Sequence, residues 1–198
     1  MGKSDQKVVK TTAESLAQAA QREGRRGLPP VHLWDPPFCG DLDMRIARDG
    51  TWFYLGTPIG RAPLVRLFST ILRRDGDDYF LVTPVEKVGI MVDDAPFVAV
   101  DFNIENSGLS QILTFETNVG DMAVAGPDNP IRVERDPKTG EPSPYVLVRA
   151  NLEALIDRKS FYRLVDIGAH HEVDGANWFG LWSSDTFFPI IPSADLDA

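Results

Sequence analysis

The chain has 198 residues, of which 43% are hydrophobic and 25% are charged, as is ordinary for a folded protein. Its formal net charge of −9 disfavours binding to a nucleic-acid polymer or to an anionic membrane surface. A single cysteine, Cys39, excludes an internal disulfide and fits a reducing compartment. Because Met1–Lys10 has no signal-peptide pattern and no apolar run is long enough to span a membrane, we expect a cytoplasmic protein.

The first predicted element is a helix at the N-terminus. It covers Thr11–Glu23, and Thr11 and Glu14 have the spacing of a capping box. Gly24–Pro30 follows as a linker with two prolines. We therefore take residues 1–30 as an N-terminal helix and linker.

Residues 31–96 form the first predicted unit. After an irregular, proline-rich stretch, alternating apolar residues around Met44 predict a strand, and Asp49-Gly50 is a hairpin signal before a strand over Trp52–Leu55. Apolar residues at helical spacing predict a helix over Pro63–Arg73. The remaining strands predicted for this unit are Tyr79–Val82 and Val88–Val92.

Residues 97–198 form the second predicted unit, which is also rich in strands. Asn151 is predicted to be the N-cap of a helix that carries Leu152, Leu155 and Ile156, and Phe161–Ile167 either extends that helix or forms a strand. The segments Trp178–Trp182 and Phe187–Ile191 flank a Ser-Ser-Asp turn and predict a terminal hairpin. The other predicted strands are Val98–Ile104, Ile112–Thr117, Met122–Ala125, Ile131–Glu134 and Tyr145–Val148.

Two pairs of segments indicate an internal duplication. Met44–Asp49 resembles Ile131–Asp136, and Arg61–Phe68 resembles Arg149–Ile156, in the same order along the chain. Chance matching is the alternative, since hairpins followed by helices are common. The predicted fold class is therefore α+β, with two related β-rich units of strand, turn, strand and helix. A cleft between the two copies is the expected place for a small ligand.

The two arginines in this repeat need a physical explanation. Arg61 and Arg149 each precede a predicted helix, where a cation is unfavourable by about 0.3–1 kcal/mol. Either a bound anion or a protein carboxylate would compensate for that charge. With 29 acidic residues in the chain, internal pairing is the simpler of the two explanations.

We find no catalytic constellation in the sequence, so we expect a binding protein rather than an enzyme, without cofactor or metal. His170-His171-Glu172 is predicted to be a solvated loop rather than a metal site, and Cys39 a packed thiol. Other positions could contact a ligand, although each also has a structural explanation. They are Thr83, Glu86, Lys87, Asn118 and Trp182.

Several stretches together resemble DUF1285, a bacterial family of uncharacterised proteins. They are His32–Pro37, Asp43–Ile46, Asp49–Trp52, Thr57–Arg61, Thr83–Lys87, Asp94–Phe97, Thr117–Gly120 and Pro144–Arg149. The resemblance implies a duplicated two-domain fold whose second domain is similar to a pleckstrin-homology barrel. It also implies a nucleotide-like ligand in the cleft and a role in signal transduction, with Arg61, Glu86, Asn118 and Arg149 at motif positions. Ser184 stands where the family favours glycine.

The sequence thus predicts a non-catalytic module that binds a small anionic, nucleotide-like ligand between its two units. Arg61 and Arg149 would hold the charge and Trp182 would stack on a base. Two alternatives stay open: a hydrolase for a small phosphorylated substrate with Glu86 as its base, and a protein-interaction adaptor. The sequence does not indicate an oligomeric state.

Overall fold

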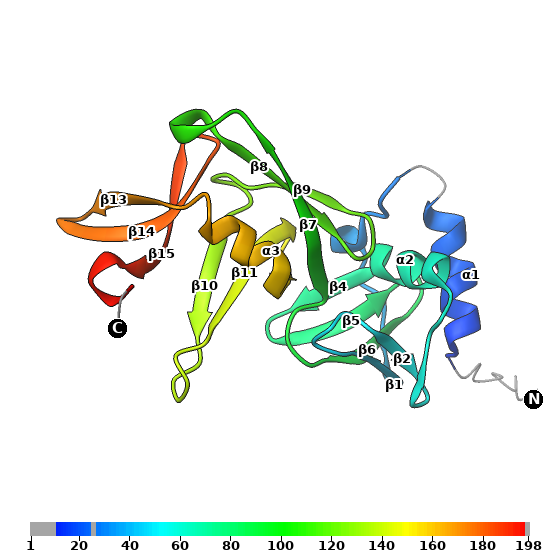
Figure 1. Cartoon of the computed structure of the whole chain (residues 1–198). Helices are drawn as coiled ribbons and strands as arrows, with labels where there is room; N and C mark the ends of the chain where they lie inside the picture. Colours follow the sequence, from blue (N-terminus) through cyan, green and yellow to red (C-terminus); the bar gives the residue numbers. More distant parts are fainter. Residues whose placement is uncertain (1–10, 25–26, 197–198) are drawn as a thin grey trace, which may run out of the picture. The chain divides into compact units, whose positions relative to one another are not determined.

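The structure is a computed structural model that describes residues 11–24 and 27–196, shown in Figure 1. Its residues form two compact units: unit 1 is Met1–Ile46 with Thr51–Val92, and unit 2 is Ala47–Gly50 with Asp93–Ala198. The prediction for Met1–Lys10 and part of the predicted linker lie outside the described residues. No helix in the described part of the chain has the length and apolar character needed to cross a membrane.

The first helix of unit 1, α1 (Ala13–Glu23), confirms the helix predicted there. Its capping box was predicted one residue too early. Thr12 is the N-cap: its side chain accepts from the Ser15 amide at 3.2 Å, and the Ser15 side chain accepts from the Thr12 amide at 3.1 Å. The Thr11 hydroxyl instead donates to the Glu86 carboxylate at 2.7 Å, so Thr11 fixes the chain before the helix rather than capping it.

The sheet of unit 1 has the strand order β3-β2-β1-β6-β5-β4. Its strands are β1 (Phe38–Ile46), β2 (Trp52–Tyr54), β3 (Thr57–Pro58), β4 (Leu72–Asp75), β5 (Asp78–Val82) and β6 (Lys87–Val92). The central neighbours β1 and β6 are parallel, and the other pairs are antiparallel. The predicted β1–β2 hairpin is therefore confirmed.

Helix α2 (Ala62–Thr70) lies between β3 and β4 in the chain and covers the sheet. The Phe68 ring stacks on Trp52 with centroids 6.3 Å apart, both rings are buried, and α1 packs against α2. The helix was predicted to continue to Arg73. It ends earlier because Leu72 and Arg73 pair with β5, and Leu72 is buried there.

The main sheet of unit 2 has the strand order β10-β11-β12-β7-β8-β9. Its strands are β7 (Phe97–Glu105), β8 (Ile112–Thr117), β9 (Met122–Val124), β10 (Ile131–Arg135), β11 (Pro142–Arg149) and β12 (Leu152–Ile156). Here β7 and β12 are the parallel pair at the centre. The edge strand β9 also contacts β11, next to the opposite edge, so the sheet curls into a half-barrel.

The two sheets share one topology, which is consistent with an internal duplication. In each sheet, the strands that come first and last in the chain are parallel neighbours at the centre. On either side of them, the outer strands pair antiparallel in chain order. By position, β1 corresponds to β7 and β4 to β10. The predicted match of Met44–Asp49 with Ile131–Asp136 is therefore wrong, since it pairs a central strand with an edge strand.

The second predicted match is wrong as well, because α2 is a helix while its supposed counterpart is the strand β12. Leu152, Ala154 and Ile156 are buried and alternate with half-buried residues, which is the period of a strand. The helix predicted after Asn151 does not form there. The helix begins later, at α3 (Arg158–Val165), where the Asp157 carboxylate accepts from the Ser160 amide at 2.7 Å.

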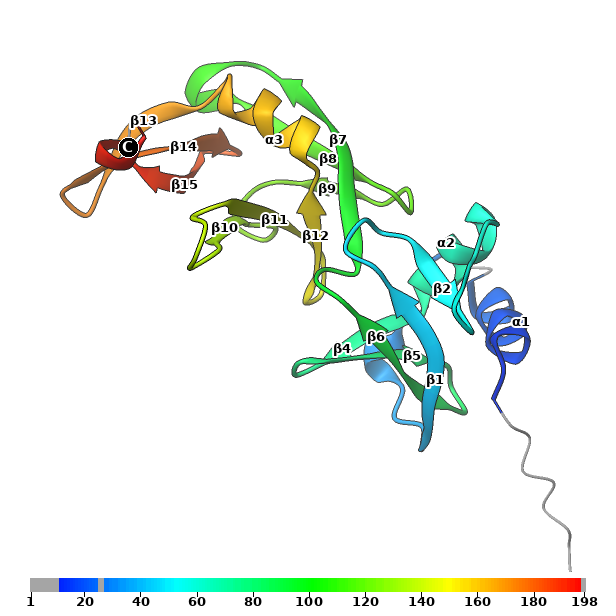
Figure 2. The ribbon, with the colours of Figure 1, turned by 60° about the horizontal axis from the view of Figure 1, so that its bottom comes forward.

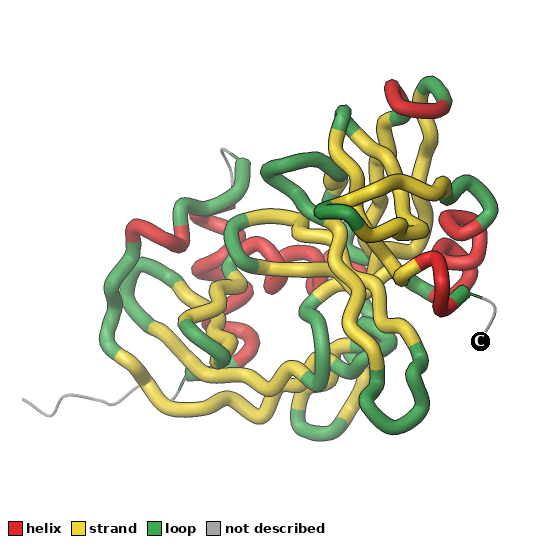
Figure 3. The backbone as a smooth tube through the Cα atoms, turned by 90° about the vertical axis from the view of Figure 1, so that its left-hand side faces the viewer, coloured by secondary structure: helices red, strands yellow, loops and turns green. Residues whose placement is uncertain are grey.

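A separate three-stranded sheet completes unit 2, as Figure 2 shows. It contains β13 (Ala169–Val173), β14 (Ala176–Ser183) and β15 (Thr186–Pro192), so the predicted terminal hairpin is confirmed. His170 and His171 were predicted to lie in a loop, but both are on β13 and pair with β14. Strands account for most of the regular structure, as the tube in Figure 3 shows.

Candidate functional site

Four of the sequence-predicted ligand residues lie in unit 1. Arg61 is the exposed N-cap of α2, and its side chain makes no capping hydrogen bond. Thr83 and Glu86 lie on the connection between β5 and β6, and Lys87 is the first residue of β6. Buried Thr83 accepts from the Glu86 amide at 3.2 Å and so shapes this turn. Lys87 lies 3.4 Å from Asp75, and its ammonium group is 4.5 Å from the centroid of a phenylalanine ring.

Asn118 and Arg149 lie close together in unit 2, near the start of β7. The Asn118 side chain accepts from the Val98 amide at 3.0 Å and donates to the Gly50 carbonyl at 3.2 Å. Arg149 forms an ion pair with Asp121. Asn118 therefore joins backbone segments, and its amide group is engaged on both sides.

The expected position of Arg149 before a helix is wrong, because it is the last residue of β11. Its guanidinium lies over the Phe97 ring, 4.8 Å from the centroid. Burial lowers the pKa of Arg149 to about 10, so it is still charged at neutral pH. Of the two compensating charges that the sequence allowed, a protein carboxylate, that of Asp121, faces this arginine.

Trp182 lies in the three-stranded sheet among other aromatic side chains. Its ring centroid is 4.8 Å from His171 and 5.3 Å from Phe187. In the following turn, Ser184 has a φ of 52°, a conformation in which glycine is favoured. Its hydroxyl donates to the Ala125 carbonyl at 2.9 Å. The glycine that the resemblance implies at this position would therefore fit the backbone conformation.

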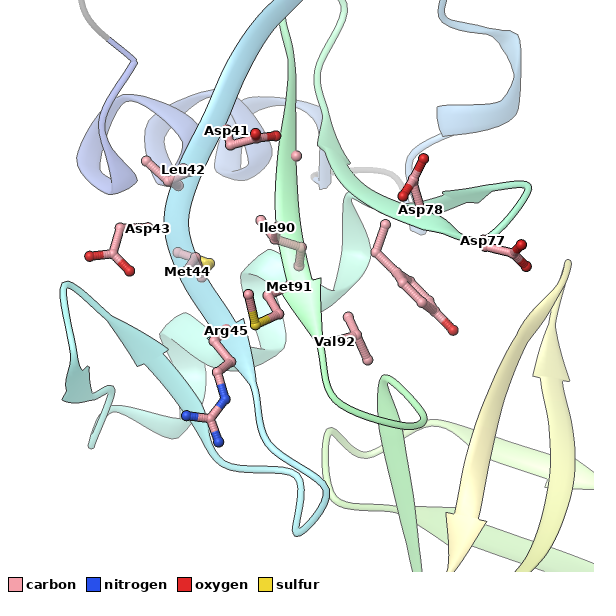
Figure 4. A pocket seen from close by; sticks show the side chains of 12 residues that line it. Asp41, Leu42, Asp43, Met44, Arg45, Asp77, Asp78, Ile90, Met91 and Val92 are labelled. Atoms are coloured by element: carbon pink, nitrogen blue, oxygen red, sulfur yellow. The ribbon is translucent and has the colours of Figure 1, made fainter. Parts of the chain in front are cut away.

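A cavity of about 520 Å³ in unit 1, shown in Figure 4, is acidic. Four aspartates and one arginine line it: Asp41, Asp43, Asp77, Asp78 and Arg45. A larger groove of about 1130 Å³ passes beside Glu86, and its described lining residues include no lysine or arginine. These lining charges do not favour an anionic ligand in either cavity, and the anion pocket that motivated a catalytic Glu86 is not formed by the described residues of the groove.

A pocket of about 320 Å³ in unit 2 has a different lining. It is formed by the turn that contains Arg48, the start of β11, the end of β12 and the start of α3. Its lining residues are Arg48, Glu141, Pro142, Ser143, Pro144, Leu155, Ile156, Asp157, Arg158, Phe161 and Tyr162. Two guanidinium groups and two aromatic rings therefore border one largely apolar pocket.

Arg48 is held in this pocket by a hydrogen-bonded network. It donates to the Ser143 hydroxyl at 2.8 Å, and its Nε lies 3.3 Å from Asp94 Oδ2. The other Asp94 oxygen accepts from the Tyr145 hydroxyl at 2.8 Å. Burial, and then the hydrogen bond to Asp94, raise the pKa of Tyr145 to about 12, so Tyr145 remains a donor at neutral pH.

Arg158 is the first residue of α3 and the second cation of the pocket. Its side chain is 73% exposed and lies 2.6 Å from Glu141, which is 61% exposed. The N-cap of α3 is Asp157, so a carboxylate already lies at the positive end of the helix, beside Arg158. From the sequence we expected an arginine at a helix start at position 149. In the structure, the arginine at the start of the helix is Arg158. The Asp157-x-x-Ser160 capping pattern is the signal that could have located it.

The described fold defines a protein of two β-rich domains that share one sheet topology. The chain belongs to the DUF1285 family, described as proteins of unknown function: the N-terminal domain of that family matches residues 29–95, and its C-terminal domain matches residues 96–190. No curated protein matches the chain.

Two solved structures are similar to this chain. A DUF1285 family protein from Silicibacter pomeroyi is 63% identical, with a TM-score of 0.84, over 92% of this chain and 98% of the other. A DUF1285 family protein from Shewanella baltica is 32% identical, with a TM-score of 0.51, over 63% of this chain and 91% of the other.

Proposed function

We propose that the protein is a non-catalytic module that binds a small anionic ligand in the unit 2 pocket. The observation that carries this proposal is the convergence of Arg48, Arg158 and the start of α3 on one cavity of about 320 Å³. That volume lies within the range of small-molecule sites. The site expected from sequence between the two units stays a prediction.

The pocket provides two kinds of contact that a nucleotide-like ligand needs. Guanidinium groups, here those of Arg48 and Arg158, bind phosphate oxygens through paired hydrogen bonds. Phe161 and Tyr162, from the next turn of α3, border the same pocket, where an aromatic ring could pack. The apolar side chains of the β12 end, Leu155 and Ile156, complete the lining.

The biological role that we propose is signal transduction in the cytoplasm, with the ligand as the signal. The likeness of unit 2 to a pleckstrin-homology barrel is part of this proposal, and the curled sheet of that unit supports it. Cys39 was predicted to be a packed thiol, which is wrong, because it is exposed; a free thiol is compatible with a reducing compartment.

Titration calorimetry of the full chain with adenosine 5′-monophosphate and with inorganic phosphate tests the proposal. We expect the double variant Arg48→Ala, Arg158→Ala to bind the nucleotide at least about tenfold more weakly than wild type, because two charge-assisted contacts are lost. The exposed Arg61→Ala variant is the matched control and should bind like wild type. A wild-type protein that binds neither probe, or a double variant that binds normally, contradicts the proposal.

A further inference from the structure

The groove of about 1130 Å³ in unit 1 is bordered by a stretch of β1 and by several apolar side chains. The apolar ones are Leu42, Tyr54, Leu55 and Val85. Leu55 is 64% exposed and Val85 is 71% exposed, although both are large apolar residues. The groove is also larger than the range of about 300–1,000 Å³ that is usual for small-molecule pockets. It therefore offers more room and more apolar contact than a small ligand uses.

The stretch of β1 at the groove has an open edge. The ladder with β2 covers only Met44–Ile46, and beyond it the Asp43 carbonyl accepts from the Leu55 amide at 2.9 Å. On its other side, β1 pairs with β6 along its length, in an irregular register. Tyr54 and Leu55, from the end of β2, border the groove, so the groove lies on the side of β1 that faces β2. Within the described residues, Phe38–Leu42 has no neighbouring strand on that side.

The charges that line the groove are negative. Asp41 and Asp43 are exposed and Leu42 between them is half-buried, so the two carboxylates share one face of β1, as Figure 4 shows. Glu86 supplies a third carboxylate, which accepts from the Thr11 hydroxyl at 2.7 Å. No described lining residue of the groove is a lysine or an arginine. A strand that carries positive charge would therefore be favoured here, and an acidic one would be repelled.

The two aspartates on β1 are not offset by cations of the described chain. Among residues 11–24 and 27–196, neither Asp41 nor Asp43 forms an ion pair. Arg45, the next residue on the same face, lies over the Phe53 ring, 5.4 Å from the centroid, and does not line the groove. In this respect the groove differs from the unit 2 pocket, whose arginines face carboxylates of the chain itself.

From the open edge and its charges we propose that the groove binds an extended segment of a partner protein as an added strand beside β1. In this segment lysine or arginine alternates with apolar residues. Alternate side chains of a strand point to opposite faces, so cations on one face meet Asp41 and Asp43 while apolar side chains on the other pack on Leu42. The backbone of Phe38–Leu42 can pair with about five residues of the partner.

This interaction surface goes beyond the function proposed above, because no residue that lines the groove also lines the unit 2 pocket. Its failure in an experiment would leave the nucleotide proposal for unit 2 unaffected.

Fluorescence anisotropy of the full chain with labelled synthetic peptides tests the proposal. One peptide alternates lysine and valine and is blocked at both ends, and its counterpart alternates glutamate and valine. We expect saturable binding of the lysine peptide and at least about tenfold weaker binding of the glutamate peptide, because like charges oppose each other across the groove. A lysine peptide that does not bind, or a glutamate peptide that binds equally well, overturns the proposal.

An N-methylated version of the lysine peptide tests the strand addition. Methylation removes the backbone donors and keeps the charges and the side chains, so binding should weaken at least about tenfold. Equal binding of the methylated peptide would show that charge alone holds the probe, and the added strand would be wrong.

The double variant Asp41→Asn, Asp43→Asn tests the charges. It should bind the lysine peptide about two- to tenfold more weakly than wild type, which is the scale of two exposed ion pairs. The matched control is Asp77→Asn, Asp78→Asn, which removes two exposed carboxylates of unit 1 that do not line the groove. The control should bind as wild type does, and circular dichroism should show that both proteins are folded. Equal weakening in the two variants contradicts the proposed site.

Cys39 reports where the peptide binds, because it is exposed, lines the groove and is the single cysteine of the sequence. A saturating concentration of the lysine peptide should slow the alkylation of Cys39 by iodoacetamide several-fold, while the glutamate peptide should leave the rate unchanged. An unchanged rate with the lysine peptide bound places it elsewhere and overturns the proposal.

Two further measurements distinguish other occupants of the groove. The full-length variant Lys7→Gln, Lys10→Gln should bind the lysine peptide as wild type does, and tighter binding would assign the groove to the N-terminal segment of the chain itself. Sedimentation velocity without peptide should give the same result for wild type and for Asp41→Asn, Asp43→Asn. A dimer that only wild type forms would assign the groove to a second copy. Either of these assignments overturns the proposal of a partner protein.

Discussion

The two units have the same strand topology but cover their sheets in different ways. In unit 1, the chain between β3 and β4 forms α2, whose Phe68 packs on Trp52 of the sheet. In unit 2, the corresponding connection between β9 and β10 contains no helix in the described structure, and the sheet curls so that β9 contacts β11. The same strand order therefore buries an apolar sheet face in two ways, under a helix in unit 1 and by curling of the sheet in unit 2.

The position of the helix along the chain also determines which residues line the pocket of each unit. The helix of unit 2 comes after the last strand of its main sheet, so the start of α3 and the end of β12 border the same cavity. Unit 1 has no helix at that point, and its cavity is lined by strand and turn residues with four aspartates. The placement of a helix along a shared topology thus gives unit 2 a pocket bordered by two arginines, whereas the cavity of unit 1 is acidic.

The largest effect that we predict contrasts a half-buried ion pair of unit 2 with an exposed pair of unit 1. Asp121→Ala should lower the free energy of unfolding by about 2–4 kcal/mol, because the variant removes the carboxylate that faces the guanidinium of Arg149, whose side chain is only 20% exposed. Asp77→Ala should lower it far less, since the Asp77 carboxylate that pairs with Arg74 is fully exposed to solvent.

Urea unfolding followed by tryptophan fluorescence measures both values. If both variants lose the same free energy of unfolding, the burial of Arg149 does not determine how strongly its ion pair stabilises the protein. The predicted contrast between the two units would then be wrong.

The next effect contrasts two glycines of similar backbone conformation. Gly50 has a φ of +83°, and an added Cβ would lie 2.5 Å from Asn118 Nδ2 and 3.0 Å from Val98 Cγ2. Gly56 has a φ of +73°, with nothing within 4 Å of an added Cβ. Gly50→Ala should therefore cost about 2–3 kcal/mol, while Gly56→Ala should cost only the conformational strain of about 1–2 kcal/mol.

Thermal unfolding of the two glycine variants gives the comparison. A Gly56→Ala protein as unstable as Gly50→Ala would show that backbone strain alone, without the contact to Asn118, accounts for the need for glycine.

The smallest effect is a pH dependence that belongs to unit 2. The pKa of Tyr145 is raised to about 12, so its stabilising contribution is full below the ordinary tyrosine pKa of about 10 and is lost as the pH rises toward 12. Between these pH values, wild type should lose about 1–2 kcal/mol more stability than Tyr145→Phe.

Urea unfolding at pH 9 to about pH 12 measures this loss. Tyr54→Phe in unit 1 is the control and should keep the wild-type profile. If Tyr145→Phe shows the same alkaline loss as wild type, the hydroxyl bond to Asp94 does not contribute in the predicted way.

The predictions from sequence succeeded where a local signal had no competitor. The Asp49-Gly50 turn lies between alternating apolar residues, and the β1–β2 hairpin formed there as predicted. The helix pattern before Thr70 was equally clear. The prediction failed at Leu152–Ile156, because a short apolar run fits a helix or a strand equally well, and only its position between β11 and β7 selects the strand.

The candidate site was the least predictable part of the molecule. Arg48, Glu141 and Arg158 are distant in the sequence, and no motif joins them. Arg149 precedes an apolar run that predicted a helix, and it was therefore the expected site residue. In the structure its partners are Asp121 and the Phe97 ring. Which arginine borders a pocket depends on strand pairing between distant segments.

By itself, the sequence determined that this is an acidic, β-rich protein, because composition and apolar periodicity are local properties. The tertiary structure alone decided which units correspond strand by strand, which helix begins beside a pocket, and which arginine lies there. Those outcomes depend on contacts between segments far apart in the chain, which no local pattern encodes.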